Sequence, residues 1–144
     1  MTGGRYGPAA WEGIVPPAPS SIDLHTHTRR SDGLLEPSAL AAQAAAAGVR
    51  LLAITDHDTL AGFRELTAGA GEGLPRHLEI VSGVEINALA TGINGLWEGE
   101  LHVLGYGVDP SDEAFETTLA GQRSARRTRF DLAVTRLREL GLAV

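Results

Sequence analysis

The sequence predicts an α/β fold: a parallel sheet or barrel whose strands are joined by helices. From Ser21 onward, short apolar runs alternate with helical stretches, an order that favours parallel strands with right-handed crossovers. Polar motifs fall at the ends of the expected strands, which is where α/β folds gather their chemistry. The 144 residues suit a single domain.

The first 20 residues are rich in Gly, Pro and Ala and lack the basic start and apolar core of a signal peptide. We expect a flexible leader at residues 1–20 and a domain at residues 21–144. No stretch is long and apolar enough to span a membrane, and there is no cysteine. His, Asp and Glu are then the only strong metal ligands, and the lack of thiols fits a reducing, cytoplasmic location.

The net charge of −6 is unevenly distributed, because arginines concentrate in residues 123–144 and the rest of the chain is acidic. Non-specific nucleic-acid binding relies on positive charge that neutralises phosphates. We therefore expect no stable binding of duplex DNA. An acidic body suits a protein that concentrates carboxylates around cations.

Four strands and two shorter helices are expected before a long final helix. The strands are expected at residues 21–26, 50–55, 78–87 and 100–106, the last two forming a hairpin around the turn-rich residues 90–99. A first helix should begin at Pro37 and stop at Gly48. A second should be capped by Asp58 or Thr59, with one apolar face made by Leu60, Phe63 and Leu66.

The final helix should open at Ser111, because the acidic Asp112 and Glu113 suit the positive end of a helix. Gly121 is a weak point within it. Its expected buried stripe consists of Phe115, Leu119, Phe130, Val134 and Leu137.

The motif DLHTHT places His25 and His27 at the end of the first strand. Residues two apart in a strand point to the same side, so both imidazoles can reach one cation. Two surface histidines would give the same pattern by chance. His77 lies in a polar loop with no carboxylate pattern around it, and we expect it to be an ordinary surface residue.

Further polar residues occupy comparable places. Asp32 follows the first strand, with Gly33 permitting a tight turn, and His57 follows the second strand, flanked by Asp56 and Asp58. Such flanking carboxylates suit a metal site, where we expect them to support the ligands rather than to bind metal. An unpaired Glu85 would be costly inside an apolar strand, and His102 lies near the start of the fourth strand.

Each of these residues also has a simpler explanation. Asp32 suits a turn and Asp58 a helix cap, while Glu85 would suit the solvent-facing side of a half-buried strand and His102 a buried core. Their joint occurrence at the strand ends of one α/β unit favours a shared metal site over these separate explanations.

Four segments in this order, DLHTHTRRSDG, LLAITDHDT, GVEI and HVLGYG, resemble the first motifs of the polymerase and histidinol phosphatase (PHP) family. The resemblance runs from about Ser21 to the C-terminus. It is closest to the stand-alone members that hydrolyse nucleoside 3′,5′-bisphosphates and trim RNA from its 5′ end. It implies the first half of a distorted seven-stranded (β/α) barrel with two to three divalent metals.

Carried over by motif, the resemblance implies that His25 and His27 hold one metal and that Asp32 and His57 hold a second. Glu85 would bridge the first metal to a third, which His102 would also bind. The segment RRTRF resembles the arginine-bearing helix of the subgroup, so that Arg126 or Arg127 would face the substrate phosphate. A solvated helix face would explain either arginine equally well. Ligands without thiolate suit Mn²⁺, Fe²⁺ or Zn²⁺.

Members of the family carry two later motifs that this sequence lacks, an HP-type segment and an Asp-x-His pair. We therefore expect an incomplete fragment, inactive by itself, of a metal-dependent phosphoesterase acting on a small nucleotide or RNA 5′ end. Weaker alternatives with the same chemistry are a histidinol-phosphate phosphatase and a polymerase-associated PHP domain. A non-catalytic metal-binding or interaction module is the alternative from another class.

Overall fold

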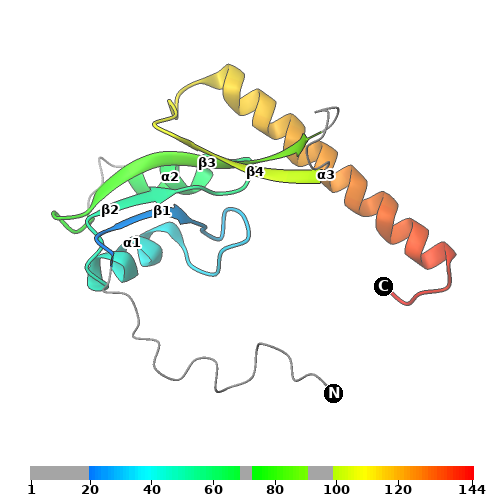
Figure 1. Ribbon diagram of the computed structural model, residues 1–144, viewed down its shortest axis with the longest axis horizontal. Helices are drawn as coiled ribbons and strands as arrows, with labels where there is room; N and C mark the ends of the chain where they lie inside the picture. The colour runs from blue at the N-terminus through cyan, green and yellow to red at the C-terminus, as the bar shows by residue number, and fades with distance from the viewer. Residues whose placement is uncertain (1–19, 69–72, 91–98) are drawn as a thin grey trace, which may run out of the picture.

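The computed structural model describes residues 20–68, 73–90 and 99–144. These residues form a curled four-stranded sheet, in the order β1-β2-β3-β4, and three helices (Figure 1). The expected α/β fold is confirmed. None of the helices in the described ranges is long and apolar enough to cross a membrane.

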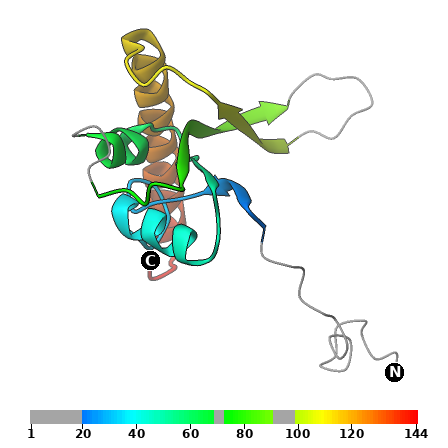
Figure 2. The same cartoon turned by 90° about the vertical axis from the view of Figure 1, so that its left-hand side faces the viewer.

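Strands β1 (Ile22–Thr26), β2 (Leu51–Ile54) and the first part of β3 (Glu79–Ala90) are parallel, with α1 (Pro37–Ala46) and α2 (Ala61–Thr67) as their crossovers. Residues 79–82 of β3 pair with β2. Residues 83–90 pair with the antiparallel β4 (Gly99–Tyr106) instead, which forms the expected hairpin. Figure 2 shows this hairpin projecting from the body of the sheet. The residues 91–98 expected to form its turn lie outside the described ranges.

Both crossover helices pack on β2, whose last three residues are buried. Helix α1 begins at Pro37 and stops before Gly48, whose φ of +89° is a left-handed conformation that glycine adopts without strain. The resulting core joins α1, β2, α2 and the segment before β3. Its buried members are Ala41, Ala44, Val49, Leu52, Ile54, Leu66 and Leu78.

Helix α2 differs from the sequence expectation in its start and in its apolar face. Its N-cap is Leu60, without a side-chain cap, although the Thr59 hydroxyl accepts a hydrogen bond from the Ala61 amide at 3.2 Å. The expected single face is wrong, because Phe63 and Leu66 pack in the core around β2. Leu60 turns instead to a second cluster. A short helix between two cores divides its apolar residues between them.

The second cluster attaches the long helix α3 (Glu113–Glu139) to the sheet. It consists of Leu60, Val84 and Leu119, with Phe115 packed against it. Helix α3 begins at Glu113, two residues after the expected Ser111, and the Asp112 carboxylate caps it by accepting a hydrogen bond from the Phe115 amide at 2.9 Å. It runs without interruption through Gly121.

The expected buried stripe of α3 is correct only in its first turns. Leu119 is fully buried, whereas Phe130 is 64% exposed and Leu137 is 37% exposed. Val134 is partly exposed. In Figure 1 the C-terminal part of α3, orange to red, runs past the sheet. No described element covers that part of the helix, so helical periodicity identified an apolar face but not its partner.

Replacing Leu119 with alanine should destabilise the domain by about 2–4 kcal/mol, because the side chain is fully buried and leaves a cavity. Leu132→Ala is the matched control on the same helix. Leu132 is 65% exposed, and its replacement should change the free energy of unfolding by no more than about 0.5 kcal/mol. Urea unfolding followed by circular dichroism measures both, and equal losses would contradict the described docking of α3.

Candidate metal centre

The carboxyl ends of β1 and β2 and the middle of β3 meet at one edge of the sheet. His25 lies in β1 and His27 just beyond it, and the alternation of a strand directs both imidazoles to one side. The chain after β2 continues alongside β3, where His57 and Glu85 form a further parallel bridge. His102 on β4 lies diagonally across from Glu85, whose direct partner is Leu104.

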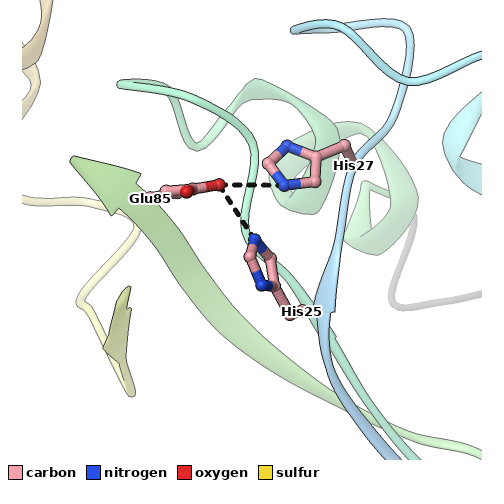
Figure 3. Close-up of side chains that lie close together, drawn as sticks. All are labelled: His25, His27 and Glu85. Atoms are coloured by element: carbon pink, nitrogen blue, oxygen red, sulfur yellow. Dashed lines mark hydrogen bonds and ion pairs between the residues drawn. The ribbon is translucent and has the colours of Figure 1, made fainter. Parts of the chain in front are cut away.

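Glu85 is the centre of the cluster. Its Oε2 atom lies 2.9 Å from Nε2 of His25 and 2.9 Å from Nε2 of His27 (Figure 3). Nε2 of His57 is 3.6 Å from the same oxygen. The other oxygen, Oε1, lies 2.6 Å from Nδ1 of His102. Four imidazoles, two from strands β1 and β4 and two from the segments that follow β1 and β2, therefore face one carboxylate.

This carboxylate is held rigidly. The Glu85 side chain is 3% exposed. Its amide donates to the Asp56 carbonyl at 3.2 Å and its carbonyl accepts from the Asp58 amide at 2.9 Å. Burial opposes its ionisation, but hydrogen bonds from His25 and His102 outweigh that effect, so the pKa of Glu85 lies below its ordinary value. Glu85 is thus an anion at neutral pH, directed into a group of nitrogen ligands.

Asp32 and His57 form the second part of the cluster. Asp32 Oδ2 lies 3.5 Å from Nε2 of His57, and Asp32 Oδ1 lies 3.3 Å from Nδ1 of His27. The Asp32 side chain is 68% exposed, so its position depends on the loop that carries it. That loop folds back so closely on the end of β1 that a Cβ on Gly33 would lie only 2.1 Å from the His27 carbonyl oxygen. Close approach, rather than an unusual φ, is why glycine is needed there.

The loop is fastened by Asp56, which is fully buried. Its Oδ1 accepts hydrogen bonds from the Thr28 amide and the Ser31 hydroxyl, both at 2.7 Å. Its Oδ2 accepts from the Thr28 hydroxyl, also at 2.7 Å. Asp56 therefore supports the loop that presents Asp32.

Three overlapping groups of side chains have the spacing that a metal ion needs. They are His25 with His27 and Glu85, His27 with Asp32 and His57, and His57 with Glu85 and His102. A neutral imidazole binds metal through one of its nitrogens, whereas a carboxylate has an oxygen for each of two metals. Nitrogen and carboxylate ligands without thiolate fit Mn²⁺, Fe²⁺ or Zn²⁺.

A cleft of about 650 Å³ opens between this cluster and α3. It is lined by Arg30, Ser31, Asp32, His57, Asn87, His102, Arg123, Arg126, Arg127 and Phe130, and we call it the arginine cleft. Arg126 pairs with the Asp58 carboxylate. Arg127 has an 81% exposed side chain, and its nearest ion-pair partner, Asp131, is 3.7 Å away. An anionic ligand in this cleft would meet guanidinium groups on one side and the cluster on the other.

Sequence reasoning missed Arg123, Arg30 and Asn87 as residues of the cleft. Arg123 had a usable signal, since it lies one helical turn before Arg126 and Arg127. Arg30 follows the DLHTHT motif in the same loop as Asp32. His77, by contrast, is exposed and lines a different pocket beside the first residues of β1, β2 and β3, as expected.

The chain resembles known proteins over most of its length. A 3′,5′-nucleoside bisphosphate phosphatase from Chromobacterium violaceum is 35% identical over 126 residues, which cover 87% of this chain and 38% of the relative. A 5′-3′ exoribonuclease from Haemophilus influenzae is 37% identical over 108 residues, covering 74% and 36%. The solved structure of an amidohydrolase from Chromobacterium violaceum, with bound sulfate and no metal, superposes with a TM-score of 0.69 at 34% identity, covering 87% and 41%.

The chain thus spans well under half the length of each of these relatives. The PHP domain model matches residues 23–128, which contain all four motifs and the described sheet except its first residue, Ile22. The described strands and helices match the first part of the barrel that the resemblance implies. The chain belongs to the PHP domain family.

Proposed function

We propose that the protein is a metal-dependent phosphoesterase that hydrolyses phosphate esters of small nucleotides or of RNA 5′ ends. The observation that carries the proposal is the position of Glu85, a buried carboxylate that faces four imidazoles at the edge of the arginine cleft. Cations and a phosphate group would then be held on opposite sides of one cleft.

His25, His27 and Glu85 are proposed to hold one metal, and Asp32 with His57 a second. Glu85 would use its other oxygen for a third metal, shared with His102; the 2.6 Å contact of Oε1 with Nδ1 supports this arrangement. Bound divalent cations would neutralise phosphate charge and lower the pKa of a bound water. The ligand set suits Mn²⁺, Fe²⁺ and Zn²⁺ alike.

The guanidinium groups of α3 are proposed to bind the phosphate. Arg126 and Arg127 line the cleft, and Arg123 joins them one turn earlier. A planar guanidinium donates two parallel hydrogen bonds to phosphate oxygens, which orients the ester as well as attracting it. Arg127 has the most exposed side chain of the three and the longest ion-pair contact, 3.7 Å to Asp131, so binding a phosphate would break the weakest of the three pairings.

The substrate class is supported by the relatives. One is named a 3′,5′-nucleoside bisphosphate phosphatase and another a 5′-3′ exoribonuclease. A related structure holds sulfate, which has the shape and charge of a phosphate group. Because those proteins are more than twice as long as this chain, we propose that residues beyond these 144 complete the metal sites. We also propose a cytoplasmic location.

The first experiment is to purify residues 1–144 and the gene product expressed to its natural stop codon. We would measure bound Mn, Fe and Zn and assay phosphate release from a nucleoside 3′,5′-bisphosphate. We expect two or more metals and turnover in the longer protein. His25→Ala should abolish turnover, because it removes a ligand that contacts Glu85. His77→Ala, an exposed histidine away from the cluster, is the matched control and should have no effect.

Other results would favour the alternatives. A protein that holds at most one metal and releases no phosphate from any ester would be a binding module. Preference for histidinol phosphate over the bisphosphate would indicate the histidinol-phosphate phosphatase instead. Equal losses in His25→Ala and His77→Ala would contradict the proposed ligands.

A further inference from the structure

Asp58 is tied to its surroundings on three sides. It follows His57 directly, is 1% exposed and has a φ of +49°, a left-handed conformation that aspartate tolerates better than most residues. Its amide donates to the Glu85 carbonyl at 2.9 Å. Its own carbonyl accepts from Nη1 of Arg123 at 2.6 Å, and its carboxylate accepts from Nη2 of Arg126. One residue therefore joins the metal ligands to α3.

The pairing with Arg126 is required by burial. A buried carboxylate without a cationic partner is strongly destabilising. Among the described residues, Arg126 is the side chain that donates to the Asp58 carboxylate, through Oδ2, and Oδ1 has no partner. One end of the Arg126 guanidinium binds Asp58. The Arg126 side chain is nevertheless 36% exposed and lines the arginine cleft.

Arg123 is held by the Asp58 backbone carbonyl and by Glu116, not by the Asp58 carboxylate. Its Nη2 atom lies 2.9 Å from Oε1 of Glu116, and the other oxygen of Glu116 lies 2.8 Å from Nη1 of Arg64. Arg64 in turn donates to the Pro110 carbonyl at 2.8 Å. The network connects α2, the start of α3 and the loop after β2. Arg127 lies in the same cleft without such support.

We infer that Asp58 is a positioning residue for anion binding: it holds the guanidinium groups of Arg123 and Arg126 over the cleft in the orientation that a phosphate beside the metal ligands needs. This inference rests on the proposed function. The physical gain is preorganisation, because an arginine that is already immobilised loses less side-chain entropy when it binds an anion. Asp58 acts through these arginines and not through the imidazole of His57.

The test uses the gene product expressed to its natural stop codon and two probes, a nucleoside 3′,5′-bisphosphate as substrate and orthophosphate as inhibitor. Asp58→Asn keeps the size of the side chain and tolerates the same φ, but removes the charge that holds Arg126. We expect the KM for the bisphosphate and the inhibition constant of orthophosphate to rise roughly 3- to 10-fold. The fall in kcat should be smaller than the rise in KM, and the metal content should match that of the wild type.

A double variant separates positioning from a purely structural role. If Asp58 acts through Arg126, Asp58→Asn should weaken orthophosphate binding much less in an Arg126→Ala background than in the wild type. Adding Asp58→Asn to the Arg126→Ala variant should also raise its melting temperature, because asparagine would replace the buried Asp58 carboxylate that has lost its cationic partner. Glu139→Gln breaks another ion pair of α3, Arg136–Glu139 at 3.0 Å, and should change none of these constants.

Three results would overturn this inference and leave the proposed function standing. They are unchanged orthophosphate inhibition in Asp58→Asn, loss of metal in that variant, or an equal loss of orthophosphate binding from Asp58→Asn in the wild-type and Arg126→Ala backgrounds. Each requires a wild-type protein that turns over the bisphosphate. A wild-type protein that neither hydrolyses the bisphosphate nor binds orthophosphate would overturn the proposed function, and the inference with it.

Discussion

Replacing Glu85 with glutamine is expected to remove metal binding and the proposed phosphoesterase activity together. The side chain is 3% exposed and contacts His25, His27 and His102 at 2.6–2.9 Å, so its two oxygens serve two of the three ligand groups. Glutamine keeps the size but loses the negative charge and one acceptor. Metal affinity should fall by more than the roughly 10- to 100-fold that loss of a supporting hydrogen bond costs.

Metal content and metal-induced stabilisation provide two independent measurements. A metal that binds only the folded protein stabilises it by RT ln(1 + M/Kd), where M is the free metal concentration, so the melting temperature keeps rising with the logarithm of the metal concentration above Kd. We expect a clear rise on adding Mn²⁺ or Zn²⁺ to the wild type and little rise in Glu85→Gln. Glu79→Gln is the matched control, because Glu79 is an exposed residue at the start of the same strand. A normal metal content in Glu85→Gln would contradict the central role of this carboxylate.

Simple regularities of α/β folds place most of the six candidate ligands in the sequence. Strand alternation directs His25 and His27 to one side. Parallel strands bring their carboxyl ends to one edge of a sheet, which unites the first motif with His57. The structure brings the six candidates into one cluster in which the three ligand groups overlap. The expected hairpin, two strands separated by a turn-rich segment, brings Glu85 and His102 together and adds them to the cluster.

Other features depend on tertiary contacts that local patterns do not encode. The exchange of partners along β3, from β2 to β4, is set by where β2 ends and not by any pattern within β3. The exposure of Phe130 depends on which elements cover α3. A carboxylate before a helix favours a cap in general, but Asp58 has a distant partner in Arg126.

Replacing Asp56 with alanine is expected to have the second largest effect, acting on stability and on one part of the cluster. Asp56 is fully buried and accepts three hydrogen bonds at 2.7 Å from Thr28 and Ser31. Alanine would leave these donors without an acceptor and would create a cavity. The free energy of unfolding should fall by about 3–5 kcal/mol, a range reached when a buried charged network is broken. Urea unfolding measures this loss.

Thr28→Val is the matched control, because it removes the hydroxyl donor to Oδ2 and keeps the amide donor to Oδ1. It should cost about 1.5–3 kcal/mol, the range for one hydrogen bond to a charged group. A cost in Asp56→Ala no larger than that in Thr28→Val would show that the loop is held by other contacts, such as the amide of Gly33 bonded to the Thr28 carbonyl at 2.9 Å.

The effect of Asp56→Ala on metal content should be selective. Asp32 is 68% exposed and depends on the loop for its position, whereas Glu85 is 3% exposed and is held by strand hydrogen bonds. The metal proposed between Asp32 and His57 should therefore bind more weakly in the variant. As the metal concentration is lowered, it should dissociate before the metal held by His25, His27 and Glu85. Titration of the folded variant with Mn²⁺ resolves the two steps. Simultaneous loss of both metals would mean that Asp56 supports the whole cluster, through its carbonyl bonded to the Glu85 amide at 3.2 Å.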